Sequence, residues 1–323
     1  MATSSIGAGL DYNDLSLWED AKQASSEDEI AELHEDIADS FIMTGWTNSQ
    51  NITIRSNITG SKRTVTNDGS TNLLSFDDAK TLGLTLQDLI LDGGNNMFAS
   101  GVIIKAGVTA LTVKRVKIHN VSAIFAGGLF ITSGANPLVA NATLENCIFV
   151  GGYNGIGVYQ STAMTAEIVN CIATKASGNG LAVANYEAQT YNFRNCLAFG
   201  NNPVQGDFDT STTSTVNVLN CVSGDATATH LNHTSSAGSV TLKTDTSAYF
   251  TDYANDDYTL AQSGYDNWGI YGDSLTTPAL DYASTARSND DIGPYEFVPA
   301  LLSLNARAPA KYMAAAIAMS PAS

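Results

Sequence analysis

The amino-acid sequence predicts an all-β solenoid, in which short strands stack coil upon coil. Two rows of residues predict it: an asparagine–cysteine pair recurs at nearly fixed spacing, and a row of apolar residues recurs in phase with it. Each repeat is also too short to hold a helix of about ten residues beside its strands. A fixed period of roughly 20 to 50 residues is the signature of repeat architectures.

The asparagine–cysteine pairs define the first row. They are Asn146-Cys147, Asn170-Cys171, Asn195-Cys196 and Asn220-Cys221, separated by 24, 25 and 25 residues. Asparagine tolerates the left-handed backbone of a sharp turn, and its amide can bond its counterpart one coil away. Reduced cysteine buries well as a small hydrophobe. We therefore predict a structural ladder, with asparagine at the turns and cysteine in the core.

Disulfide bridging or metal binding is the alternative for the four cysteines. Stacked residues have parallel Cβ vectors, which fit disulfide geometry poorly. No Cys-x-x-Cys pair points to zinc. We expect no metal and no cofactor.

The apolar row sets the number of coils. Its members are Leu74, Val102, Leu129, Ile156, Leu181, Phe208 and Leu231, in steps of 28, 27, 27, 25, 27 and 23 residues. In the cysteine row, Leu89, Val116 and Asp245 take the equivalent position. Three short strands fit each repeat, and strands one coil apart pair in parallel. This predicts a parallel β-helix of about seven or more coils in residues 51–250.

The two ends of the solenoid need caps, because an open stack exposes strand edges. Residues 1–50 are expected to form the N-terminal cap, with Asp14 as N-cap of an amphipathic helix of about three turns that buries Leu15 and Trp18. Entry strands follow in "DEIAELHED", "DSFIMTGWT" and "NITIRSNIT". Residues 251–297 are expected to form the C-terminal cap.

An apolar tail follows in residues 298–323, and its composition differs from the rest of the chain. Such a tail needs a surface to cover, and we expect it to dock on a neighbouring subunit. Ile103 and Phe130 are expected to face outward and to join this contact. The predicted interface residues are Ile103, Phe130, Leu301, Leu302, Tyr312, Met313 and Ile317.

Four features carry a family resemblance: "SIGAGLDYNDLSLWEDA", "GWTNSQNITIRS", the asparagine–cysteine coils and "DIGPYEF". In this order they resemble right-handed parallel β-helix repeat proteins of the bacteriophage virion and tailspike type, over Ser5 to Phe297. The resemblance implies a right-handed fold and side-by-side association, for example as a homotrimer. It does not fix an activity, because the architecture serves lyases, tailspikes, adhesins and decoration proteins alike.

Charge and hydropathy exclude some functions. The formal net charge of −17 makes a nucleic-acid surface implausible, because phosphate binding needs clustered Lys and Arg. No apolar run reaches the roughly 20 residues that span a bilayer, and the N-terminus lacks the features of a Sec signal. We expect no membrane partner and a virion location after synthesis in the host cytoplasm.

The expected outer face of the apolar-row strands offers little for catalysis. Its residues are Gly101, Gly128, Gly155, Gly180, Asp207 and His230 in one row, and Ile103, Phe130, Gly157, Ala182, Asp209 and Asn232 in the other. Glycoside hydrolysis would need paired carboxylates at the centre of this face. The catalytic candidates are Asp207, Asp209 and His230, with Asn232 beside them; the alternative is a solvated polar turn.

These observations favour a non-enzymatic structural protein of a phage particle: a decoration, spike or fibre-like subunit. It would be a stiff acidic rod, anchored by its tail to other virion proteins and copies of itself, with its flank free to contact bacterial surface polysaccharide. One alternative is a tailspike depolymerase, acting as a polysaccharide lyase or glycoside hydrolase. Another is a bacterial surface adhesin.

Overall fold

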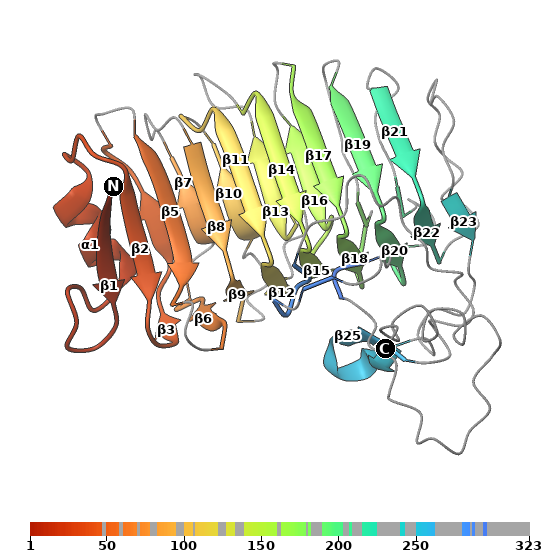
Figure 1. Ribbon diagram of the computed structural model, residues 1–323, viewed down its shortest axis with the longest axis horizontal. Coiled ribbons are helices and arrows are strands. Elements are labelled where there is room, and N and C mark those ends of the chain that lie inside the picture. Colours follow the sequence, from red (N-terminus) through yellow and green to blue (C-terminus); the bar gives the residue numbers. More distant parts are fainter. Residues whose placement is uncertain are drawn as a thin grey trace, which may run out of the picture.

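The chain forms a parallel β-helix (Figure 1). The computed structural model describes residues 1–46, 50–57, 61–69, 72–77, 83–94, 100–105, 107–121, 127–132, 139–159, 163–178, 180–181, 189–202, 207–208, 215–224, 240–242, 250–261, 280–284, 286–287 and 293–295. Within them three sheets run along the coil axis, and all of their strand pairs are parallel. This confirms the predicted all-β solenoid.

The described strands of the three sheets are as follows, each in stacking order. Sheet A holds β1 (Ala2–Ile6), β2 (Glu29–Leu33), β5 (Asn51–Ser56), β8 (Gly83–Gln87), β11 (Ala110–Lys114), β14 (Asn141–Glu145), β17 (Thr165–Val169), β19 (Thr190–Arg194) and β21 (Thr215–Leu219). Sheet B holds β3 (Ile37–Ala38), β6 (Arg63–Thr66), β9 (Leu89–Asp92), β12 (Lys117–Val121), β15 (Ile148–Gly151), β18 (Ile172–Thr174), β20 (Leu197–Phe199), β22 (Cys221–Ser223) and β23 (Val240–Leu242). Sheet C holds β4 (Phe41–Met43), β7 (Asn72–Phe76), β10 (Ser100–Ile104), β13 (Leu129–Thr132) and β16 (Ile156–Tyr159).

The apolar row lies in register along sheet C, as predicted. Val102 pairs with Leu74 on one side and with Leu129 on the other. The row continues through Ile156 and an isolated bridge to Leu181. All five side chains are buried, because alternate residues of each strand point into the interior. Leu231 lies outside the described residues.

The asparagine row takes the left-handed conformation that the sequence predicts. The φ angles of Asn146, Asn170, Asn195 and Asn220 lie between 51° and 54°. Asp88 and Arg115 occupy the same turn in earlier coils, with φ of 57° and 54°. The predicted ladder between stacked amides is wrong for Asn146, whose Nδ2 donates instead to the carbonyl oxygen of Leu280. The row therefore serves as a turn and as an attachment point.

The four cysteines are unpaired and buried in a file inside the helix. Cys147, Cys171 and Cys196 directly precede a sheet B strand, and Cys221 begins one. Those strands pair in register, so the sulfur atoms stack coil upon coil. The predicted reduced core packing is confirmed. One assignment in this row is wrong: Val240, rather than Asp245, pairs with Cys221.

Burial predicts that these thiols are inert in the folded chain. It raises the pKa of Cys171 and Cys221 well above the ordinary value, and the thiolate is the reactive form. We expect Ellman's reagent to leave the native protein unmodified and to titrate four thiols after denaturation in guanidinium chloride. Rapid modification of even one thiol in the native protein would contradict the buried file.

The N-terminal helix, α1 (Leu15–Lys22), is shorter than the three turns expected. Asp14 is its N-cap, as predicted, and accepts a hydrogen bond from Leu17 N at 2.7 Å. Trp18 is buried against Phe41 of β4 and against Trp46, so the helix closes the end of sheet C. The coil stacking of sheet A already begins at β1, within the segment expected as a cap.

The glycine row of sheet C does not form the open outer face that the sequence predicts. A Cβ at Gly101 would lie 2.5 Å from the carbonyl oxygen of Gly128, and one at Gly155 would lie 2.6 Å from that of Gly180. These positions face the backbone of the next coil. Glycine is required here because the coils approach too closely for any side chain.

The described residues of the C-terminal part lie along the outside of sheet B. A hairpin of β24 (Phe250–Asp252) and β25 (Asp257–Leu260), joined by the 3₁₀ turn Tyr253–Asn255, packs on the outward residue Phe199. The described residues of 280–295, drawn in blue in Figure 1, lie beside β12, β15 and β18. We call the described residues of 250–261 and 280–295 the strap. The strap contains the described part of the expected C-terminal cap, and it lies on the flank of the shaft.

Aromatic side chains of the strap seal this flank. The outward residues of sheet B form an apolar stripe that the strap covers with Phe250, Tyr258 and Tyr282. The stripe consists of Ile148, Val150, Ile172, Leu197, Phe199 and Val222. Sheet B is therefore buried on both faces over this length, as is usual for parallel sheets.

Candidate functional site

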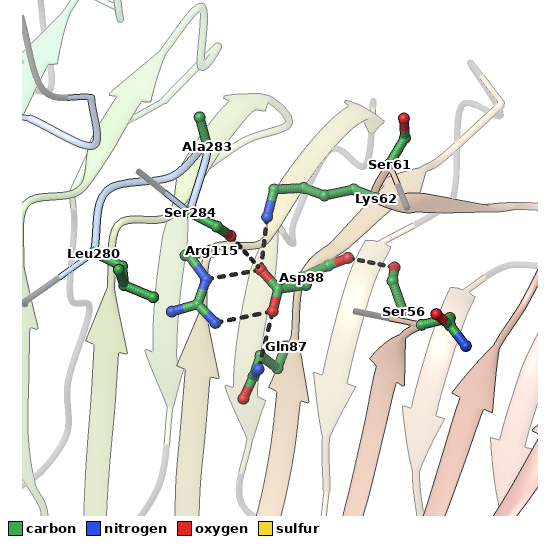
Figure 2. Close-up of a pocket in the computed structure, with 10 residues that line it drawn as sticks. Ser56, Ser61, Lys62, Gln87, Asp88, Arg115, Leu280, Ala283 and Ser284 are labelled. Atoms are coloured by element: carbon green, nitrogen blue, oxygen red, sulfur yellow. Dashed lines mark hydrogen bonds and ion pairs between the residues drawn. The ribbon is translucent and has the colours of Figure 1, made fainter. Parts of the chain in front are cut away.

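A pocket of about 400 Å³ opens where the strap meets the turn between sheets A and B (Figure 2). Its lining residues are Ser56, Asn57, Ser61, Lys62, Gln87, Asp88, Arg115, Leu280, Ala283 and Ser284. Three of them come from the strap, and the others come from the coils that contain β5, β8 and β11. The pocket is thus built from segments nearly 200 residues apart in sequence.

Asp88 is the centre of the pocket and is bound by two cations. Arg115 donates from Nε to Oδ1 at 2.7 Å and from Nη2 to Oδ2 at 2.9 Å, a two-pronged contact. Lys62 Nζ donates to Oδ1 at 2.8 Å. The three charged side chains are only 13% to 14% exposed, so solvent screens their interactions weakly.

The repeat itself brings the charges together. Asp88 and Arg115 each follow a sheet A strand and take the left-handed turn that asparagine takes in later coils. Because β8 and β11 pair in register, these turns lie one coil apart, at contact distance for an ion pair. Lys62 precedes β6, the sheet B strand one coil before β9. Stacking therefore places all three side chains side by side.

The strap completes the pocket. Tyr282 is buried, and Lys62 Nζ lies 4.6 Å from the centre of its ring, a cation–π contact. Ser284 Oγ lies 3.5 Å from Asp88 Oδ1. Leu280 forms an apolar wall and remains 38% exposed. Oδ2 of Asp88, which accepts from Arg115, also accepts a hydrogen bond from Gln87 Nε2 at 2.9 Å.

Electrostatics make this site suited to binding and unsuited to proton transfer. Burial alone would raise the pKa of Asp88, but hydrogen bonds from Arg115 and Lys62 outweigh it and hold the pKa well below its usual range. Burial lowers the pKa of Lys62. A general acid or base needs a pKa near the working pH. Asp88 instead stays ionised at all physiological pH values and holds two cations in place.

The strap is fastened to the shaft by further polar contacts away from the pocket. Asn170 Nδ2 donates to Gly293 O at 2.9 Å, and Gly293 N donates to Asn195 O at 2.8 Å. Arg287 Nη2 bridges Asn146 Oδ1 and Gly293 O at 2.7 and 2.8 Å. Lys175 pairs with Asp256 at 2.6 Å. The pocket wall is thus held by a row of anchored turns.

The catalytic candidates from the sequence do not form a site among the described residues. Asp207 was expected on the outer face, but it is only 1% exposed. Its carboxylate accepts bonds from Asn201 Nδ2, Ser223 Oγ and Gly224 N, at 2.7, 2.7 and 3.0 Å, so it stabilises the turns of the last coils. Asp209, His230 and Asn232 lie outside the described residues.

Two of the predicted interface residues, Ile103 and Phe130, lie among the described residues. The expected exposure of Ile103 is wrong, because its side chain is only 8% exposed. Phe130 is half-buried and pairs in register with Ile103. The tail residues Leu301, Leu302, Tyr312, Met313 and Ile317 lie outside the described residues.

The described residues hold no group of three or more His, Cys, Asp or Glu side chains placed to bind a metal ion. Among the same residues, no helix has the length and apolar character needed to cross a bilayer.

Comparisons with known proteins indicate the fold. The family model described as right handed beta helix region matches residues 99–247. No curated protein matches the sequence. A crystal structure of the pectin methylesterase from Aspergillus niger is similar, with a TM-score of 0.40 and 11% identity, over 76% of this chain and 92% of that chain. At that TM-score the likeness supports no argument about activity. The chain therefore contains a right-handed β-helix region.

Proposed function

We propose that this chain is a non-enzymatic structural subunit of a phage particle, a stiff acidic shaft anchored through residues 298–323. The observation that carries the non-enzymatic part of this proposal is the pairing of Asp88, the carboxylate of the described pocket, with two cations. Asp88 is fixed between Arg115 and Lys62, so it holds the wall of the pocket and is unsuited to proton transfer.

The shaft itself supports the same role. Sheet A stacks nine described strands without interruption, and the interior is filled with apolar side chains. The strap covers the flank of sheet B. Buried thiols that remain unpaired suit folding in a reducing cytoplasm, where a phage protein is made. The net charge of −17 favours a soluble, mutually repelling shaft surface.

Particle association tests the proposal. We expect an antiserum against the purified chain to detect it in density-gradient-purified virions at constant stoichiometry. Incubation of the chain with host surface polysaccharide should release no new reducing ends and no unsaturated sugars. Polysaccharide cleavage would support the depolymerase alternative instead. Immunogold labelling of cells, with virions unlabelled, would support an adhesin.

Removal of residues 298–323 tests the anchor. The truncated chain is expected to keep the circular dichroism spectrum and Tm of the full chain, because the apolar side chains of the coils themselves fill the interior of the shaft. It should lose its association with virions. The matched control replaces the tail with a Gly/Ser segment of equal length, and it should behave like the truncation. Normal incorporation of either variant would contradict anchoring by the tail.

A further inference from the structure

The pocket retains hydrogen-bond donors that Asp88 does not use. Arg115 contacts Asp88 through Nε and Nη2, which leaves Nη1 outside this pair. Lys62 donates to Asp88 through one of the three protons on its ammonium group. In Figure 2, Lys62 and Arg115 approach Asp88 from two sides, with Leu280 and Ser284 of the strap close by. A ligand in the pocket would therefore meet two cationic groups.

The charge balance of the pocket favours a monoanion. Two cations against one carboxylate leave one net positive charge, within a chain whose net charge is −17. Glu145 is the further carboxylate that acts on Arg115, and it is paired with Lys114 at 3.1 Å. A single carboxylate on a ligand would neutralise this one net positive charge, at a site where solvent screens charges weakly.

The remaining lining favours a hydroxylated ring. Ser61, Gln87 and Ser284 supply neutral hydrogen-bonding groups, while Leu280 and Ala283 supply an apolar surface. A sugar ring has this combination of hydroxyl groups at its edge and C–H groups on its faces. A volume of about 400 Å³ lies at the lower end of small-molecule pockets, which are roughly 300 to 1,000 Å³. The pocket therefore suits one or two sugar rings.

We propose that this pocket binds a sugar acid, a hydroxylated ring bearing one carboxylate. The carboxylate contacts Lys62 Nζ and Arg115 Nη1, and the ring lies against Leu280 of the strap. Bound ligand would touch both the coils and the strap, so occupancy also stabilises the attachment of the strap.

Isothermal titration of the full chain with D-glucuronate, D-glucose, acetate and inorganic phosphate tests the ligand class. We expect glucuronate to bind at least tenfold more tightly than each of the other three. Equal binding of glucose would show that the carboxylate of glucuronate does not contribute to binding. Equal binding of acetate or phosphate would reduce the pocket to a site for simple anions. Either result, or no binding of glucuronate, overturns the proposal.

Variants at Leu280 locate the site without disturbing the buried ion pairs. Leu280→Asp places a negative charge on the exposed wall and should weaken glucuronate binding at least tenfold, whereas Leu280→Lys should retain or strengthen it. Lys62→Met should also abolish binding, and its Tm shows whether it remains folded. Lys105→Gln is the control, because Lys105 lies outside the pocket lining and pairs with Asp77 rather than with a charge of the pocket. Unchanged affinity in Leu280→Asp would contradict the assigned site.

The result of the glucuronate-binding test does not depend on whether the chain is a subunit of a phage particle. Loss of sugar-acid binding in Leu280→Asp should leave virion association intact, and removal of residues 298–323 should leave glucuronate binding intact. The two proposals can therefore fail separately.

Discussion

Gly127→Ala is expected to destabilise the β-helix by about 3 kcal/mol or more, at the upper end of the cost of overpacking. A Cβ at this position would lie 1.4 Å from the carbonyl oxygen of Asn154 in the next coil. That oxygen cannot move freely, because it accepts the stacking hydrogen bond from Gly128 N at 3.0 Å. Urea unfolding, followed by circular dichroism, measures the loss as a lower midpoint.

Gly83→Ala is the matched control for this substitution. Gly83 begins β8, and the one close contact of an added Cβ there would be with Oδ1 of Asn51, at 2.8 Å, at the end of a side chain that can rotate away; the backbone oxygen of Ala110 lies at 3.8 Å, an ordinary contact. We expect a change in the free energy of unfolding within about 0.5 kcal/mol. A Gly127→Ala protein as stable as Gly83→Ala would mean that the coils are less closely packed than described.

Asp88→Asn is the second substitution with a large expected effect, a loss of about 3 kcal/mol. Asparagine tolerates the φ of 57° at this turn, so the backbone should be unaffected. The loss comes from Lys62 and Arg115, which remain buried without their shared carboxylate. Asp77→Asn is the control: its pair with Lys105 is 29% and 41% exposed, and such pairs contribute less than about 1 kcal/mol. Equal effects of the two substitutions would contradict the buried cluster.

The same cluster predicts a pH dependence of stability. The pKa of Asp88 in the folded chain is lower than that of an aspartate in the unfolded chain, which is about 4. Its contribution is therefore fully present above the unfolded pKa and is lost as pH falls below it toward the folded pKa. As the pH falls from about 5 to about 2, the wild-type protein should lose stability that Asp88→Asn does not lose. Parallel pH profiles of the two proteins would argue against this role of Asp88.

The fold could be predicted from the sequence because the coils repeat at nearly constant spacing. The register of Val102, Leu129 and Ile156 could be predicted, since one spacing fixes which side chains stack. The left-handed turns at asparagine followed from the chemistry of that side chain. The length of α1 could not be predicted, because it depends on where the chain must return to sheet A.

The pocket was missed, although a signal for it was present. Leu89 and Val116 could be aligned with the cysteine row, which places Asp88 and Arg115 in the asparagine row one coil apart. Opposite charges in consecutive coils at a turn indicate an ion pair. The strap could not be predicted in this way, because its contacts with Asn146 span 134 and 141 residues and follow no period.

The strap also changes how the solenoid should unfold. A stack of coils with only nearest-neighbour contacts can lose its terminal coils one at a time, because each interface is broken independently. Here Tyr282 of the strap contacts Lys62, and Gly293 of the strap contacts Asn195 several coils away, so fraying at the C-terminal end must also detach contacts with distant coils. These long-range contacts should make unfolding of the solenoid more cooperative than unfolding of a stack that has nearest-neighbour contacts alone.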